Sequence, residues 1–237
     1  AHGIGAGDTV ALLMDNSLEC ILAWLALSAI GCTDVPINPQ YRGQLLSYLL
    51  EDSQATAAIC DSHYLPQLAG IAGSLPGLRS VIINGQRQDA PACWHMADFA
   101  ECAASGDGFA PPRESAERVI LYSSGTTGPS KGVVHTQKSC LVLSRYNAEV
   151  MGYGPSDRLL NFFPLFHQNA RYTGVIPALL AGASIRVARR LSTSSFWKTC
   201  DSDGATAFTY LGSVLRMILN VTPPERARGN HSLRKAF

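Results

Sequence analysis

Tyr122-Ser123-Ser124-Gly125-Thr126-Thr127-Gly128-Pro129-Ser130-Lys131-Gly132-Val133 is the stretch of this 237-residue chain that decides its fold and chemistry. An apolar run, residues 119–121, leads into it, and a second valine follows it. Glycine lets a backbone turn its N–H groups onto one point, serine and threonine add hydroxyl donors, and lysine adds a compact positive charge. A polyphosphate offers many acceptor oxygens and several negative charges. The stretch therefore predicts a phosphate-binding loop.

Three commoner explanations fit this stretch less well. A hairpin turn between two strands needs only a few turn residues, so it does not account for hydroxyls, glycines and a lysine together. A Walker A loop requires G-x-x-x-x-G-K-[ST], whereas Lys131 follows Ser130 and precedes Gly132. The dinucleotide motif G-x-G-x-x-G does not fit either, because residues 3–7 have glycines spaced G-x-G-x-G and stand before a strand.

The rest of the chain alternates short apolar runs with helical patterns. Alternation of this kind implies parallel strand pairing with right-handed crossovers, so we expect an α/β fold with layered parallel sheets and flanking helices. The expected strands cover residues 9–14, 35–39, 55–60, 80–84, 118–122, 158–163, 184–188, 206–211 and 232–237, and the expected helices cover 16–30, 43–52, 64–72, 137–151, 171–180, 193–199 and 213–220.

A break in this alternation suggests where the chain divides. Residues 85–117 hold three prolines, several charges and a run of small residues, which is typical of an irregular connection with one short helix near 96–101. We therefore expect a first α/β subdomain over 1–84, the connection over 85–117, and a second subdomain over 118–237 that carries the loop.

Composition excludes several classes of protein. The chain is 46% hydrophobic and 16% charged, which describes a globular protein with a large core. Its net charge of +1 gives no electrostatic reason to expect nucleic acid as a partner. Seven scattered cysteines without a C-x-x-C pair predict reduced, mostly buried thiols and a cytoplasmic protein. The longest apolar run, residues 20–30, is too short to cross a bilayer.

A second informative stretch is Phe162-Phe163-Pro164-Leu165-Phe166-His167-Gln168-Asn169. A strand is expected to end at Phe163, Pro164 interrupts it, and His167 precedes the next helix. Ligand sites in open α/β sheets form at the ends of parallel strands. A single histidine beside aromatic residues is nevertheless more often part of a packed core. Tyr210 lies at the end of a later expected strand, and the sequence fits a pocket wall and an ordinary core residue equally well.

Both stretches resemble motifs of one family. Residues 122–133 resemble the signature phosphate loop of the AMP-forming adenylating enzymes, which include acyl-CoA synthetases, the adenylation domains of peptide synthetases, and beetle luciferases. Residues 164–167 resemble the next core motif of that superfamily, and the likeness implies that His167 is a wall or gate of the acyl pocket. Gln168-Asn169 departs from the small or glycine-rich continuation that is common there. Residues 166–169 and 210–212 are similar to the carnitine/crotonobetaine branch of CoA ligases.

The resemblance implies a two-step reaction. A small carboxylic acid attacks the α-phosphate of Mg-ATP to give an acyl-adenylate and pyrophosphate, and a thiol, usually CoA, then displaces AMP. ATP, Mg²⁺ and CoA are the implied cofactors, with Lys131 and His167 as the catalytic candidates. The implied ligands of the β- and γ-phosphates are Ser123, Ser124, Thr126, Thr127, the amides of Gly125 and Gly128, and Lys131. A carrier-protein-loading adenylation domain and a non-catalytic ATP-binding relative stay open as alternatives, as does a homodimeric assembly.

The resemblance also implies that part of the site lies outside this sequence. In the family, the adenine- and ribose-binding motifs, the magnesium-binding acidic residue and the catalytic lysine lie further along the chain than the phosphate loop. We therefore expect the 237 residues to form an N-terminal fragment of a synthetase that is inactive by itself.

Overall fold

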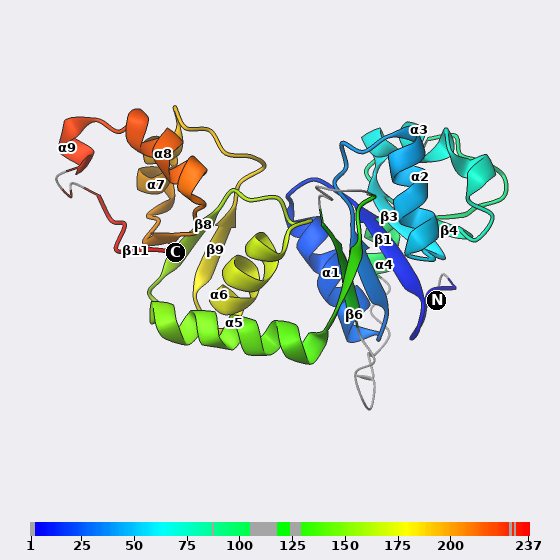
Figure 1. Ribbon diagram of the computed structural model, residues 1–237, viewed down its shortest axis with the longest axis horizontal. Coiled ribbons are helices and arrows are strands. Elements are labelled where there is room, and N and C mark those ends of the chain that lie inside the picture. The colour runs from blue at the N-terminus through cyan, green and yellow to red at the C-terminus, as the bar shows by residue number, and fades with distance from the viewer. Residues whose placement is uncertain (1–2, 87, 105–117, 124–128, 228, 230) are drawn as a thin grey trace. The chain divides into compact units, whose positions relative to one another are not determined.

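The chain folds into two compact units. The computed structural model describes residues 3–86, 88–104, 118–123, 129–227, 229 and 231–237. The units are Ala1–Gln137 and Lys138–Phe237 (Figure 1). No helix among these described residues is long and apolar enough to cross a membrane.

Unit 1 is built on a seven-stranded sheet, counted over the described residues, with the strand order β5-β4-β3-β1-β2-β6-β7. All neighbouring strands are parallel except the last pair, β6 and β7, which are antiparallel. The strands are β1 (Thr9–Leu13), β2 (Thr33–Pro36), β3 (Ala57–Asp61), β4 (Ser80–Asn84), β5 (His95–Asp98), β6 (Arg118–Tyr122) and β7 (Gly132–Thr136). The helices are α1 (Leu18–Ala29), α2 (Gly43–Asp52), α3 (Leu65–Ala69) and α4 (Phe99–Ala104), with 3₁₀ turns at Ser62–Tyr64 and Ala72–Ser74.

Helices cover both faces of this sheet. Successive side chains of a strand point to opposite faces, so the central strands need apolar residues throughout. Ala58 and Cys60 of β3 pack in one cluster with the leucines of α2 and α3, whereas Ile59 turns toward α1 and α4. Figure 1 shows α2 and α3 on one side of the strands and α1 on the other. Between α1 and α4 the second face leaves an apolar cavity of about 410 Å³.

Local signals fix the two longest helices of unit 1. The Ser17 hydroxyl caps α1 by accepting a 3.0 Å hydrogen bond from the Cys20 N–H, which satisfies one of the free donors at the start of a helix. Gly31 follows the end of α1 at φ +79°, a conformation that favours glycine. In α2, Leu46, Leu49 and Leu50 are spaced on one face and all are buried. This burial anchors α2 firmly to the sheet.

Unit 2 contains a smaller sheet, four-stranded over the described residues and parallel throughout, with the order β11-β10-β8-β9. The strands are β8 (Arg158–Asn161), β9 (Ser184–Val187), β10 (Ala207–Phe208) and β11 (Lys235–Ala236). The helices are α5 (Gln137–Met151), a π-helix (Asn169–Val175), α6 (Ile176–Leu180), α7 (Phe196–Asp203), α8 (Gly212–Asn220) and α9 (Pro224–Ala227). Leu159 and Ala207 pack against residues of α5 and α6 on one face, while Phe208 meets Phe196 of α7 on the other.

A buried carboxylate ties unit 2 together. Asp157, just before β8, lies 2.7 Å from the Lys235 Nζ and 2.9 Å from an Arg234 nitrogen, both near the end of the chain. Its carboxylate also accepts hydrogen bonds from the Thr206 hydroxyl at 2.8 Å and the Gly154 N–H at 3.0 Å. Burial by itself would raise the pKa of Asp157, but the bonds from Lys235, Thr206 and Arg234 hold that pKa well below its usual range.

The structure differs from the sequence-based expectation at several places. The division falls after Gln137, because β6 pairs with β2, so the expected boundary between 84 and 118 lies inside unit 1. The expected irregular connection contains β5, which adds to β4 as an edge strand, and α4. The expected helix over 171–180 starts as a π-helix at Asn169. In α5, Leu141, Val142, Tyr146 and Val150 are exposed, and the helix buries Cys140, Ser144 and Asn147.

Candidate functional site

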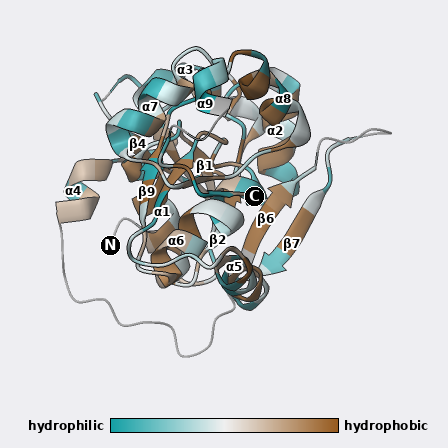
Figure 2. Cartoon of the chain, turned by 90° about the vertical axis from the view of Figure 1, so that its left-hand side faces the viewer, coloured by the Kyte–Doolittle hydropathy of each residue, from teal (hydrophilic) through white to brown (hydrophobic). Residues whose placement is uncertain are grey.

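The glycine-rich stretch joins two antiparallel strands. β6 and β7 pair from Arg118 with Thr136 to Tyr122 with Gly132, so residues 123–131 form the connection. Nine residues are more than a tight hairpin turn requires. Much of the stem is hydrophobic, as the brown of β6 and β7 in Figure 2 shows. Val133 and Val134 of the edge strand β7 are 47% and 54% exposed.

The base of the loop is closed by its own backbone. The Ser123 N–H donates to the Lys131 carbonyl at 3.1 Å, and the Ser123 hydroxyl lies 3.4 Å from the same oxygen. The hydrogen bond from the Ser123 N–H holds the backbone of Lys131 in place. Ser123 and Lys131 are both exposed, so the lysine side chain is accessible at the surface. The structure thus brings together Ser123 and Lys131, the first and last of the expected phosphate ligands.

The remaining expected ligands lie outside the described residues. These are Ser124, Gly125, Thr126, Thr127 and Gly128. Their assignment stays a prediction, as do the roles of Ser123 and Lys131.

Helix α2 supports the stem of the hairpin. The Tyr48 hydroxyl donates a 2.9 Å hydrogen bond to the Ser130 carbonyl. The Tyr122 hydroxyl lies 2.6 Å from the Asp52 carboxylate, and burial together with this hydrogen bond raises the pKa of Tyr122 above its ordinary value. A Cβ at Gly132 would stand 2.8 Å from Ile120 Cγ2 and 3.2 Å from Tyr122 Cζ, so the Tyr122 ring packs closely over this glycine.

Sequence reasoning missed Tyr48 and Asp52. They precede their hairpin partners by 82 and 70 residues, so local patterning carries no sign of these contacts. Tyr48 and Asp52 are four residues apart in α2, and residues at that spacing share one face of a helix. The helical spacing of residues 43–52 could have predicted that Tyr48 and Asp52 lie on the same helix face. It could not have predicted that this face contacts the hairpin.

His167 lies in unit 2, at the corner that follows β8. Its N–H donates to the Pro164 carbonyl at 3.0 Å, which closes a turn over residues 164–167. The ring of His167 lies 4.4 Å from that of Phe166, centroid to centroid. His167 is exposed, but partial desolvation still lowers the pKa of its imidazole below the ordinary value, because desolvation penalises the charged form. The expected role of His167 as a wall of the acyl pocket stays a prediction.

Residues around this turn form the aromatic part of unit 2. Phe162 lies 5.1 Å from Phe163 and 6.3 Å from Phe208, centroid to centroid. Tyr210 is half-buried, 6.1 Å from Phe208, with its N–H bonded to the Phe237 carbonyl. Arg171 of the π-helix is fully buried, and its Nε donates to the Leu165 carbonyl. The turn is therefore fixed from inside the unit by a side chain that sequence reasoning did not single out.

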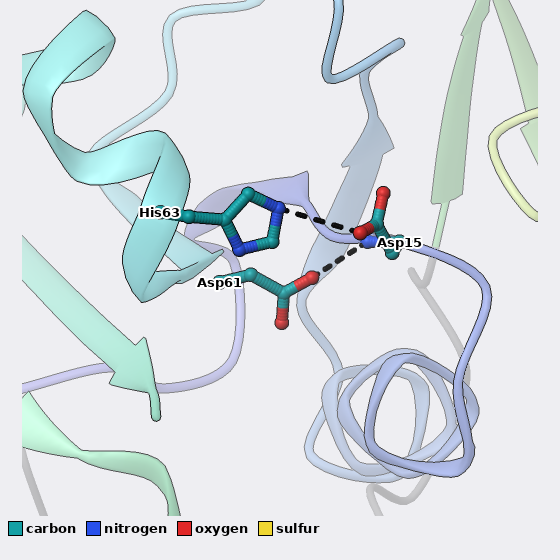
Figure 3. Close-up of side chains that lie close together, drawn as sticks. All are labelled: Asp15, Asp61 and His63. Atoms are coloured by element: carbon teal, nitrogen blue, oxygen red, sulfur yellow. Dashed lines mark hydrogen bonds and ion pairs between the residues drawn. The ribbon is translucent and has the colours of Figure 1, made fainter. Parts of the chain in front are cut away.

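One group of described residues has a composition that could suit a metal ion. Asp15, Asp61 and His63 present ligand atoms within 4.8 Å of one another at the ends of β1 and β3 (Figure 3). Protein donors already occupy the carboxylates, however. The Asp61 oxygens accept from the Asp15 N–H and from Asn84 Nδ2, each at 2.7 Å. Those of Asp15 accept from the Tyr64 hydroxyl at 2.6 Å and lie 3.3 Å from His63. These hydrogen bonds and the contact with His63 link the ends of β1, β3 and β4 to one another.

Comparison with known proteins identifies the family. The whole chain, residues 1–237, matches the family described as AMP-binding enzyme. The chain belongs to this family, which confirms the resemblance drawn from the two motifs.

Individual relatives agree with the family assignment. A 3-hydroxybenzoate–CoA/4-hydroxybenzoate–CoA ligase from Thauera aromatica is 32% identical over 194 residues, which cover 79% of this chain and 36% of the relative. A crotonobetaine/carnitine–CoA ligase from Salmonella typhi is 29% identical over 243 residues, covering 99% of this chain and 46% of the relative. The inhibitor-bound N-terminal domain of FACL13 from Mycobacterium tuberculosis matches with a TM-score of 0.78 and 26% identity, over 99% of this chain and 57% of that one. This chain thus spans less than half the length of the two curated relatives.

Proposed function

We propose that this chain forms the phosphate-binding part of an AMP-forming acid–thiol ligase, an acyl-CoA synthetase. The observation that carries the proposal is the β6–β7 hairpin, which closes a hydroxyl- and glycine-rich loop with Lys131 at its end, in a member of the AMP-binding enzyme family. The curated relatives are named as CoA ligases for aromatic and for carnitine-type acids, which supports a carboxylic acid as substrate.

The reaction would proceed in two steps. A carboxylate oxygen attacks the α-phosphorus of Mg-ATP, the bond to the β-phosphate breaks, and pyrophosphate leaves. The sulfur of CoA then attacks the acyl carbon, the thiol proton is released, the bond from that carbon to the phosphate oxygen of AMP breaks, and AMP leaves. The first step needs little covalent help from a protein, but it needs the triphosphate held in place and its charge offset.

The loop residues would supply this positioning. Ser123, Ser124, Thr126, Thr127 and the amides of Gly125 and Gly128 would hold the β- and γ-phosphates. Lys131 would offset their charge, and its exposed side chain is free to reach a ligand outside the unit. His167 would line the acyl pocket. Because the chain spans less than half of its curated relatives, the complete reaction would need the rest of the protein.

Product analysis of the full-length protein tests this function. It would be incubated with Mg-ATP, CoA and a panel of acids that includes hydroxybenzoates and carnitine-type acids. We expect AMP, pyrophosphate and one acyl-CoA thioester in equal amounts. Acyl-adenylate that forms but passes only to a carrier protein would favour the carrier-loading alternative. Binding of ATP without turnover of any acid would favour the non-catalytic one.

A further inference from the structure

A hydrogen bond from outside the glycine-rich stretch holds its final limb. The Tyr48 hydroxyl of α2 donates to the Ser130 carbonyl at 2.9 Å. Ser130 directly precedes Lys131, so this bond fixes the peptide from which the lysine departs. Tyr48 is half-buried against the core of unit 1, and its neighbour Leu49 is completely buried. The donor is therefore held on a firmly packed helix.

The backbone of Lys131 is also held on its C-terminal side. Its carbonyl accepts the Ser123 N–H at 3.1 Å, and the next residue, Gly132, pairs with Tyr122 in the sheet. The Tyr122 hydroxyl in turn bonds Asp52, one helical turn after Tyr48. One face of α2 thus contacts both limbs of the hairpin. The exposed Lys131 side chain takes its starting point from this framework.

We propose that Tyr48 is a positioning residue for Lys131. Its hydroxyl holds the Ser130 carbonyl so that the lysine projects toward the phosphates of Mg-ATP, which rests on the function proposed above. Tyr48 acts through the backbone and touches no reacting atom. Loss of its hydroxyl leaves the hairpin paired but lets residues 130 and 131 move, and this weakens the contact between lysine and phosphate.

The test measures the affinity of the full-length protein for Mg-ATP by calorimetry. Tyr48→Phe removes one oxygen and keeps the ring that packs on the core. We expect the Kd for Mg-ATP to rise about 5- to 10-fold, the range that a net hydrogen bond supports. Tyr64→Phe is the matched control, because it loses a 2.6 Å hydroxyl bond to Asp15 in the same unit. We expect that control to leave the Kd unchanged, and melting curves verify that both variants are folded.

The same substitution in a Lys131→Ala protein shows whether Tyr48 acts through Lys131 or only stabilises the unit in general. If Tyr48 acts through Lys131, Tyr48→Phe changes the Kd little once Lys131→Ala is present, because coupled residues are not additive. An unchanged Kd for Tyr48→Phe alone, or an equal increase in the Lys131→Ala background, would overturn the proposal.

The same preparations keep this proposal apart from the proposed function. Pyrophosphate exchange is measured alongside binding. A wild-type protein that binds Mg-ATP but exchanges no pyrophosphate with any acid overturns the ligase function, while the Kd values still decide the role of Tyr48. A full-length protein that binds no Mg-ATP overturns both.

Discussion

The Tyr122 hydroxyl donates a 2.6 Å hydrogen bond to the carboxylate of Asp52, which ties the start of the glycine-rich stretch to a helix 70 residues earlier. We expect Tyr122→Phe to lower the free energy of unfolding by about 1 kcal/mol, the usual net value of one hydrogen bond. Urea denaturation measures this change. In an Asp52→Ala background the same substitution should cost much less. Tyr146→Phe, at a 65% exposed tyrosine, is the control. Equal losses in both backgrounds would contradict the pairing.

Lys131 should matter for one half of the reaction only. In the full-length protein, Lys131→Ala removes the charge that we place at the phosphates, so acyl-adenylate formation should slow about 100-fold. Thioester formation from supplied acyl-adenylate and CoA should change little, because no triphosphate is present in that step. Rapid-quench assays of each half-reaction measure the difference. The exposed Lys198 supplies the control variant Lys198→Ala, and equal losses in both halves would count against a phosphate role.

Asp157 should make the stability of unit 2 depend on pH. Its folded-state pKa is depressed, so its contribution is present above the unfolded carboxyl pKa of about 3.9 and is lost as pH falls through the folded pKa. At pH 7, Asp157→Asn should lower the free energy of unfolding by about 2 to 4 kcal/mol, since it leaves Lys235 and Arg234 without their partner. Denaturation at pH 7 and near pH 3 should show that the difference in free energy of unfolding between wild type and Asp157→Asn becomes smaller in acid. Asp89→Asn at an exposed site is the control, and a stability difference between wild type and Asp157→Asn that is as large near pH 3 as at pH 7 would contradict this account.

The cysteines should differ sharply in reactivity. Cys93 is exposed and Cys102 is partly exposed, whereas the other five thiols are buried and reduced. Burial raises the pKa of Cys32 to about 11 and those of Cys60 and Cys200 to about 12, and the thiolate is the reactive form. At pH 8 we expect fast labelling of Cys93, slower labelling of Cys102, and labelling of the rest only after unfolding. Peptide mass spectrometry locates the labels, and Cys93→Ser should remove the fast phase. Rapid modification of Cys60 in the folded chain would contradict the burial.

The elements that the sequence predicted well are those with a strong local signal. The helix over 43–52 has leucines at helical spacing, and the strand over 80–84 is a compact apolar run between turn residues; both have the expected bounds in the structure. The stretch over residues 122–133 stood out because its residue types are unusual together, and its role in binding phosphate stays a prediction. The family match confirms the fold class and the family that these signals predicted.

The elements that the sequence missed depend on distant partners. β5, with the sequence His-Met-Ala-Asp, has no strand-like pattern and exists because β4 offers it an edge. β7 begins at Gly132 and exposes its valines, so only its pairing with β6 defines it. Tyr48 and Arg171 act on backbone carbonyls, Ser130 and Leu165, that no sequence pattern links to them.

Exchange of labelled pyrophosphate into ATP by the full-length protein tests the central claim most directly. Exchange reports reversible adenylate formation without any thiol, and it isolates the step that the loop is proposed to assist. The account predicts exchange that depends on a carboxylic acid and on Mg-ATP, and that falls about 100-fold in Lys131→Ala. Exchange at the wild-type rate in Lys131→Ala, or no exchange with any acid in the wild-type protein, would contradict it.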